Sequence, residues 1–297
     1  MRGRARSQAG KRKSRAGEAA LDVTIVGPGR VGQAIGNLLA AAGVSIRCVA
    51  ARQKNAARHA VQFIGSGVAA NLDDPELAGA SVILLTVSDR ALDPLARLLA
   101  KIRSDWHGRV VLHTCGTLPA SVLRPLKRRG AAVGSLHPFQ TVPTPAAGSR
   151  NLTSCFWAIE GDRKACQVAM RLARALEGTP FQMGPSGKIL YHAGAVLACG
   201  AVVALLEQSA RLLRRSGVPA EMVRPMLGRF LTETVSNFVK LGGRKALTGP
   251  QARGDWATVE KHFRAMRRLT PDVVPVYREL TRAMARLAGR TAPRRLA

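Results

Sequence analysis

The stretch that decides the fold is Leu21–Gly32, which reads LDVTIVGPGRVG. Its first half is mostly apolar and β-branched, which is typical of a strand buried in a parallel sheet. Its second half places Gly27, Gly29 and Gly32 in a G-x-G-x-x-G pattern, and a helix-like stretch follows until Gly43 stops it. A strand, a glycine-rich turn and a helix in this order predict a dinucleotide-binding unit.

Each glycine of the turn has its own task in such a unit. Gly27 permits the tight turn, Gly29 lets the backbone approach a pyrophosphate, and Gly32 lets helix and strand pack closely. The start of the helix presents free N–H groups and the positive end of its dipole to the phosphates. We expect Arg30 and Val31, within the same loop, to complete the cofactor contacts. An ordinary strand-to-helix turn without a ligand is the alternative.

The second predicted strand, residues 45–51, ends where such proteins choose their cofactor. An NAD-binding protein usually carries Asp or Glu here, ~20 residues after the glycines, to hold a ribose hydroxyl. This sequence reads AARQK at residues 50–54, without an acidic residue. Arg52 can hold a 2′-phosphate through its planar guanidinium, and Lys54 adds charge. The sequence therefore predicts NADP rather than NAD, unless Arg52 is only a solvated loop charge.

Strands and helices alternate along the next hundred residues. Further strands are predicted at 68–69, 81–87, 109–113 and 131–136, with helices at 91–102 and 119–129. This alternation predicts an α/β fold with a doubly wound parallel Rossmann sheet. Ligands lie outside the carboxyl ends of the strands in such sheets. Ser88 and Thr114 follow two of these ends and are expected to line the nicotinamide and its ribose, although each is equally explained as a turn residue.

The pattern changes after a Pro- and Gly-rich loop at residues 137–151. Strands at 156–160 and 179–183 flank a helix at 163–176, and helical patterns follow at 186–215, 219–241, 256–269 and 271–289. Asp255 and Thr270 are the expected N-caps of the last two helices, and Pro271 follows the second cap. The sequence thus predicts four parts. These are a disordered basic tail at 1–20, an NAD(P)-binding Rossmann domain at 21–184, an all-helical substrate and dimerisation domain at 185–290, and a disordered tail at 291–297.

The 297-residue chain carries a formal net charge of +28. Residues 1–20 contain seven Arg or Lys and one Glu. They are interpreted as a nucleic-acid or membrane-surface tether, a targeting segment, or translation from an upstream start codon with no role. Elsewhere the arginines are spread along helices, and aromatics are only 4%, so the aromatic interleaving of a nucleic-acid platform is missing. We therefore do not expect a nucleic-acid partner; a basic surface favours anionic ligands such as NADP and carboxylates.

Cysteine and hydropathy patterns predict a cytoplasmic protein. The five cysteines are odd in number and form no CxxC pair, which indicates reduced thiols and no metal site. No signal-peptide pattern is visible. The longest apolar run, residues 193–206, falls short of the ~20 residues that span a bilayer. We expect it to be a buried helix at a subunit interface, and we expect no membrane association.

Three residues are candidates for catalysis. Lys188 and His192 lie four positions apart near the start of a predicted helix, so they share one face, which we expect to look into the interdomain cleft. Lys188 would bind a substrate carboxylate or protonate the product oxygen, and His192 would donate a proton near working pH. His137 follows the strand at 131–136 and is the third candidate. Their structural alternatives are a solvated lysine, a satisfied core histidine and a loop-pinning hydrogen bond.

The later part of the sequence holds motifs more specific than the glycine turn. They are SLHPFQ at 135–140, IEGD at 159–162, KILYHA at 188–193, and ALTGP at 246–250 followed by RGD at 253–255, Thr258, Val259 and His262. With these motifs in this order, residues 21–290 resemble the Rossmann-like proteins that carry domain of unknown function 2520. Those proteins are similar in turn to the deazaflavin-dependent NADP oxidoreductase, pyrroline-5-carboxylate reductase and 3-hydroxyisobutyrate dehydrogenase groups.

The resemblance implies a Rossmann domain, a helical domain that supports homodimers, and an NAD(P)-dependent reductase of a small carbonyl or imine compound. The 2-keto acid ketopantoate is one candidate substrate. The chain departs from the family pattern at Cys199-Gly200, where Ser-Asn is expected, and at Cys115-Gly116, where Ser-Gly is usual. The lost amide at Gly200 motivates the alternative of a non-catalytic NADP-binding regulatory or sensor protein.

Overall fold

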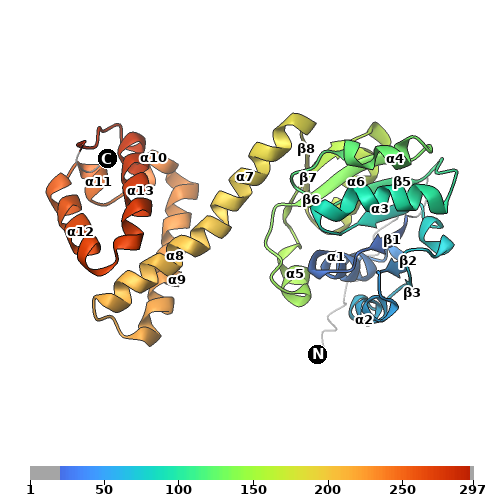
Figure 1. Cartoon of the computed structure of the whole chain (residues 1–297), viewed down its shortest axis with the longest axis horizontal. Coiled ribbons are helices and arrows are strands. Elements are labelled where there is room, and N and C mark those ends of the chain that lie inside the picture. The colour runs from blue at the N-terminus through green and yellow to red at the C-terminus, as the bar shows by residue number, and fades with distance from the viewer. Residues whose placement is uncertain (1–20, 295–297) are drawn as a thin grey trace, which may run out of the picture. The chain divides into compact units, whose positions relative to one another are not determined.

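The computed structural model describes residues 21–294 of the chain. The tail predicted at 1–20 and the last three residues of the tail predicted at 291–297 lie outside the described residues. The chain divides into two compact units, the first ending at Ala195 and the second beginning at Val196 (Figure 1). This division falls eleven residues beyond the predicted end of the sheet domain at residue 184, inside a helix, so the start of that helix belongs with the sheet.

The first unit is built on one eight-stranded sheet with the strand order β3-β2-β1-β4-β5-β6-β7-β8. The strands from β3 to β6 pair in parallel, and β7 and β8 pair in parallel with each other. This confirms the predicted α/β fold class. The strands are β1 (Asp22–Val26), β2 (Ser45–Ala50), β3 (Val68–Ala70), β4 (Val82–Leu85), β5 (Val110–His113), β6 (Ala132–Pro138), β7 (Phe156–Gly161) and β8 (Thr179–Gln182).

The sequence pattern predicted a parallel sheet. The observed sheet differs at one pair of strands, because β7 runs antiparallel to β6. The segment between them holds a short helix, α5 (Pro145–Asn151), which the Pro- and Gly-rich pattern did not reveal. That helix packs on α1 (Arg30–Ala41), where Gly148 lies against Ala34. The chain therefore returns to the sheet at the end where β6 left it, and an antiparallel neighbour needs no crossover.

Helices cover both faces of the sheet, and one buried apolar cluster lies under each layer. Val23 and Ile25 of β1 point into the cluster beneath α1, α2 and α6, whereas Val26 points into the cluster beneath α3 and α4, as the two-residue period of a strand requires. The helices and 3₁₀ turns are α2 (Lys54–Ile64), η1 (Pro75–Ala78), α3 (Asp89–Ile102), η2 (Ala120–Leu123), α4 (Arg124–Lys127), α6 (Arg163–Ala175), η3 (Pro185–Gly187) and α7 (Lys188–Ala198).

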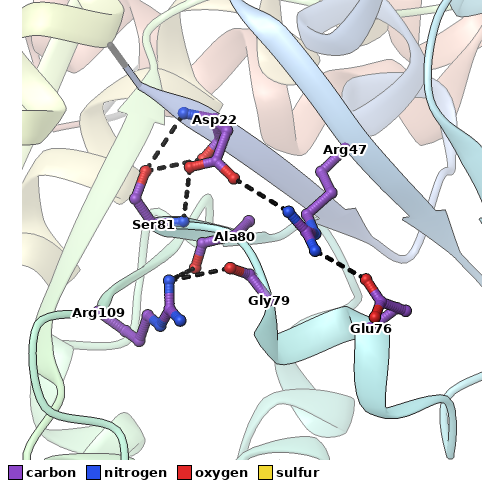
Figure 2. Close-up of polar contacts among 7 residues, drawn as sticks. All are labelled: Asp22, Arg47, Glu76, Gly79, Ala80, Ser81 and Arg109. Atoms are coloured by element: carbon purple, nitrogen blue, oxygen red, sulfur yellow. Dashed lines mark hydrogen bonds and ion pairs between the residues drawn. The ribbon is translucent and has the colours of Figure 1, made fainter. Parts of the chain in front are cut away.

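A polar network fastens the amino ends of four strands (Figure 2). The Asp22 carboxylate accepts the backbone N–H of Ser81 at 2.8 Å, and the Ser81 hydroxyl donates to the Asp22 carbonyl at 3.1 Å. Arg47 of β2 lies between Asp22 and Glu76, and Arg109 donates to the two carbonyls that precede Ser81. Burial alone would raise the pKa of Asp22, but the hydrogen bonds from Ser81 and the nearby Arg47 hold it below 3.8. This network lies at the sheet edge opposite the carboxyl ends, so its role is structural.

The second unit is helical. Its small core consists of Val259, Phe263, Met266, Val273 and Val274. Asp255 caps a helix as predicted, because its carboxylate accepts the N–H of Thr258 at 3.1 Å, whereas Thr270 makes no side-chain cap. Its elements are α8 (Gly200–Arg215), α9 (Ala220–Leu241), α10 (Gly243–Ala246), α11 (Pro250–Arg253), α12 (Trp256–Leu269), η4 (Pro271–Val273) and α13 (Val274–Leu287).

The apolar run at 193–206 differs from its prediction in one way. The expected single helix 186–215 is interrupted at Cys199, so α7 and α8 follow each other. Within this chain Leu197 and Val203 are 68% and 65% exposed, so the expected burial at a subunit interface stays a prediction. An apolar pattern does not say whether its partner is the same chain or another molecule. By length and composition alone, Pro185–Arg215 is the one described segment that could cross a membrane.

Candidate functional site

The glycine turn between β1 and α1 has the geometry that a diphosphate needs. Gly27 has φ +85°, and an added Cβ there would lie 2.3 Å from Val87. A Cβ on Gly32 would lie 2.3 Å from the hydroxyl of Thr86. A Cβ on Gly29, in contrast, would meet nothing within 4 Å. Gly29 precedes α1 and supplies no side-chain cap, so the first N–H groups of that helix stay available beside open space.

A pocket of about 850 Å³ opens over this turn. It brings together Gly27, Gly29, Arg52 and Ser88, which are four of the predicted cofactor residues. The rest of the lining is largely apolar and contains no acidic residue: Pro28, Ala51, Gln53, Ala56, Leu72, Thr86, Val87, Arg90, Ala91, Pro94, Leu95 and Leu98. The pocket thus combines the exposed backbone of the glycine turn, a largely apolar lining and two arginines, Arg52 and Arg90.

Four other predicted cofactor residues do not line this pocket. Gly32 packs against Thr86 beneath the turn. Arg30 points elsewhere, since its guanidinium donates to the Pro143 carbonyl at 3.3 Å. Val31 packs against the apolar core under α1, and the backbone N–H of Thr114 donates to the Leu85 carbonyl at 3.1 Å. Within the described chain they shape and support the turn and the sheet edge.

Thr86, at the end of β4, is a supporting residue that sequence reasoning missed. Its hydroxyl donates to the Gly27 carbonyl at 2.7 Å and also lies where a side chain at Gly32 would have to go. It therefore fixes the turn from below. The available signal was its place directly after the strand run 82–85, two residues before the candidate Ser88.

A row of buried polar side chains crosses β5, β6 and β7 at one register. His113 pairs with Ser135, and Ser135 pairs with Glu160. Lys188 lies over this row and is only 1% exposed; its ammonium donates to the Ser135 hydroxyl at 2.9 Å and to the Cys115 carbonyl at 3.2 Å. Burial lowers the pKa of Lys188, and the negative charge of Glu160 opposes that shift. Lys188 thus ties the first residue of α7 to the sheet through two polar contacts.

His137, Tyr191 and His192 meet one turn farther along α7. The Tyr191 hydroxyl and His137 Nδ1 are 2.9 Å apart, and the His137 and His192 rings lie 6.1 Å apart. A Cβ on Gly116 would be 2.7 Å from both His137 Nε2 and His192 Cδ2, so this glycine leaves room for both rings. All three side chains are partly exposed, unlike Lys188.

Burial keeps His113, His137 and Tyr191 uncharged at neutral pH. It lowers the pKa of His113 to about 3 and that of His137 to about 4, with the positive charge of Lys188 acting in the same direction. Burial also raises the pKa of the Tyr191 phenol to about 12. A neutral imidazole hydrogen-bonded to a protonated phenol can give up or take a proton without a full charge in the resting state.

Tyr191 is the second functional candidate that sequence reasoning missed. It stands three residues after Lys188 and one before His192, so the same helical spacing placed it on their face. Asp89 at the start of α3 was also missed; its carboxylate accepts the Thr117 hydroxyl at 2.7 Å and holds the loop after β5. In both cases the contact partner comes from a distant part of the chain.

The buried histidines predict that the protein is acid-labile. Between pH 6.5 and about 4 the unfolded chain binds protons at His113 and His137 that the folded chain does not. The free energy of unfolding should therefore fall as the pH falls, by about 1.4 kcal/mol per pH unit for each histidine. Thermal unfolding measured from pH 8 to pH 4.5 checks this. His113→Asn should lower stability at pH 8 but flatten the slope, whereas His59→Asn, on the exposed face of α2, should keep it. An unchanged slope in His113→Asn would contradict the assignment.

Comparisons with known proteins agree with this architecture. Residues 8–138 match a Rossmann-like domain, and residues 155–284 match the domain of unknown function DUF2520. No curated protein matches the sequence.

Solved structures show the same fold. A protein from Thermotoga maritima is 23% identical, with a TM-score of 0.69 over 90% of this chain and 98% of that one. A reductive aminase from Aspergillus terreus in complex with NADPH and ethyl-5-oxohexanoate is 18% identical, with a TM-score of 0.60 over 92% and 89%. A pyrroline carboxylate reductase from Plasmodium falciparum with NADP bound is 13% identical, with a TM-score of 0.59 over 91% and 100%. The chain therefore consists of a Rossmann-like domain followed by a DUF2520 domain, the combination that its motifs predicted.

Proposed function

We propose that the protein is an NADP-dependent oxidoreductase that reduces a small carbonyl or imine compound, such as a 2-keto acid. The observation that carries the proposal is the pocket in which the open backbone at Gly29 and the guanidinium of Arg52 border one cavity without an acidic residue. The NADPH-bound reductive aminase and the NADP-bound pyrroline carboxylate reductase with the same fold support it by analogy.

The residues present fit the cofactor. The turn at Gly27 and Gly29 would hold the pyrophosphate, the apolar part of the lining would take the adenine, and Arg52 would bind the 2′-phosphate. Ser88 belongs to the same lining and would lie beside the nicotinamide. Bound there, NADPH would supply the hydride.

The proton would come from the cluster of His137, Tyr191 and His192, where β6 meets α7. In this assignment His137 Nδ1–H donates to the Tyr191 oxygen, which leaves the Tyr191 O–H free to donate to the substrate oxygen or nitrogen. His137 then stabilises the phenolate that forms. His192 is the second candidate donor, because it lies beside His137 above Gly116. Lys188 holds the helix in place and lends its positive charge to the site.

Turnover of NADPH with a panel of keto acids, aldehydes and cyclic imines tests the proposal. Tyr191→Phe should lower kcat about 100-fold, the usual effect of losing a general acid, without changing NADPH affinity. Tyr277→Phe is the matched control, because the Tyr277 hydroxyl also contacts a histidine, His262 Nδ1 at 2.8 Å, within the helical unit. Absence of NADPH binding would refute the function. NADPH binding without turnover of any substrate would favour the non-catalytic NADP-binding alternative.

We propose that two copies of the chain associate through α7, α8 and α9. Large apolar side chains are exposed along these helices, among them Leu190 at 79%, Phe230 at 74% and Val239 at 76%. Large exposed apolar side chains of this kind are typical of a subunit interface.

Size-exclusion chromatography with light scattering checks the dimer. The molar mass measured for the native protein should be twice the chain mass of 31.6 kDa. Phe230→Asp should elute as a monomer, because a carboxylate would be desolvated at the interface. Val276→Asp, which changes an exposed side chain of α13 outside the surface proposed to associate, should remain dimeric. A monomeric native protein would refute this association.

The cysteines support a reducing location for the protein, which we propose is the cytoplasm. All five are free thiols, and only Cys199 is exposed. An exposed thiol such as that of Cys199 stays free where glutathione keeps thiols reduced.

A further inference from the structure

The cofactor pocket is bordered by two arginines, of which only Arg52 follows from the sequence pattern. Arg90 is the second, and it lines the same cavity from a different element. Arg52 lies between β2 and α2, whereas Arg90 is the second residue of α3. Both side chains are exposed, and no ion pair involving either is found within residues 21–294.

The surroundings of Arg90 explain why its charge is available. The carboxylate of the neighbouring Asp89 accepts a hydrogen bond from the Thr117 hydroxyl at 2.7 Å. The next cation along α3, Arg97, is paired with Asp93 at 2.8 Å. One arginine of this helix is therefore neutralised on the surface, while the one that borders the pocket is not.

Much of the lining that the two arginines share is apolar. Ala56, Leu72, Pro94 and Leu95 offer apolar surface of the kind that a purine ring packs against. The described lining contains no Asp or Glu that could accept hydrogen bonds from a ribose diol. An anion beside such a ring is the ligand that complements two guanidiniums at the rim.

We propose that Arg90 is a specificity-determining residue that binds the 2′-phosphate of NADP together with Arg52. This inference rests on the proposed function, because it assigns a residue to the cofactor of that same site. It adds a second cation from α3 to the one at the end of β2. Discrimination between NADP and NAD is then shared by the loop after β2 and the start of α3.

Calorimetric titration of the full-length protein with NADPH, NADH and adenosine 2′,5′-bisphosphate tests the assignment without turnover. Arg90→Ala should weaken binding of NADPH and of the bisphosphate about 10-fold, as expected for the loss of a charge-assisted hydrogen bond. Binding of NADH should stay within about twofold, because NADH lacks the phosphate. Arg97→Ala is the matched control on α3 and should change none of the three affinities. Thermal unfolding of each variant verifies that the fold is kept.

The possible outcomes separate this inference from the proposed function. If the native protein binds no NADPH, the proposed function fails and the role of Arg90 fails with it. If the native protein prefers NADPH but Arg90→Ala binds all three ligands as the native protein does, only the role of Arg90 is refuted. Equal weakening of NADPH and NADH would also refute it, since Arg90 would then contact a group that both cofactors share.

Discussion

Replacing Gly29 by alanine is expected to weaken NADPH binding about 10- to 100-fold while leaving thermal unfolding unchanged. The added methyl group meets nothing within 4 Å in the protein, so the fold has no reason to resist it. It would instead occupy the space in which a pyrophosphate approaches the first N–H groups of α1. Each hydrogen bond to a charged group that is lost costs about 1.5 to 3 kcal/mol, which corresponds to that range of affinity.

Gly32→Ala is the matched comparison for this prediction. Its methyl group would lie 2.3 Å from the Thr86 hydroxyl, which already holds the Gly27 carbonyl. We expect this variant to lose about 1 to 3 kcal/mol of unfolding free energy through overpacking. Calorimetry and thermal unfolding of the two variants should therefore give opposite patterns. Unchanged NADPH affinity in Gly29→Ala would show that no diphosphate lies at this turn.

The glycine turn could be predicted because its chemistry is local. Strand, turn and helix are adjacent in sequence, and the roles of Gly27, Gly29 and Gly32 follow from backbone sterics alone. The same locality explains why Arg52 could be selected and why Asp255 was correctly expected to cap a helix. Thr86 and Arg90 escaped prediction because their importance depends on contacts made across the sheet edge.

Strand direction and helix exposure depend on partners that a pattern does not specify. The apolar segment 156–160 reads the same whether it pairs in parallel or, as found, antiparallel to β6. The run at 193–206 is apolar enough to be buried, but within this chain it is exposed. Likewise, the spacing of Lys188 and His192 gave their shared face correctly but not their different depths, since Lys188 is buried and His192 is partly exposed. Those depths follow from Ser135 and Cys115, which lie more than fifty residues away in sequence.

Replacing Lys188 by methionine is expected to lower the free energy of unfolding by about 3 kcal/mol. Methionine keeps much of the volume but leaves the Ser135 hydroxyl and the Cys115 carbonyl without their donor inside the protein. It also removes a positive charge that interacts with the buried Glu160. Removing one member of a buried charged network costs about 3 to 5 kcal/mol, because its partners stay buried. Urea unfolding followed by circular dichroism measures the change.

Lys164→Met provides the control for this variant. Lys164 also donates to a backbone carbonyl, that of Gly108 at 3.1 Å, but it does so on the surface. Its replacement should change stability by no more than about 0.5 kcal/mol. If Lys188→Met unfolds at the native urea concentration and loses only activity, then Lys188 reaches the substrate directly, and its burial beside Ser135 is not the resting arrangement. If stability falls as expected, the Lys188 ammonium helps to hold the start of α7 against the sheet. The positions of Tyr191 and His192 relative to a substrate would then depend on Lys188, although Lys188 itself need not contact the substrate.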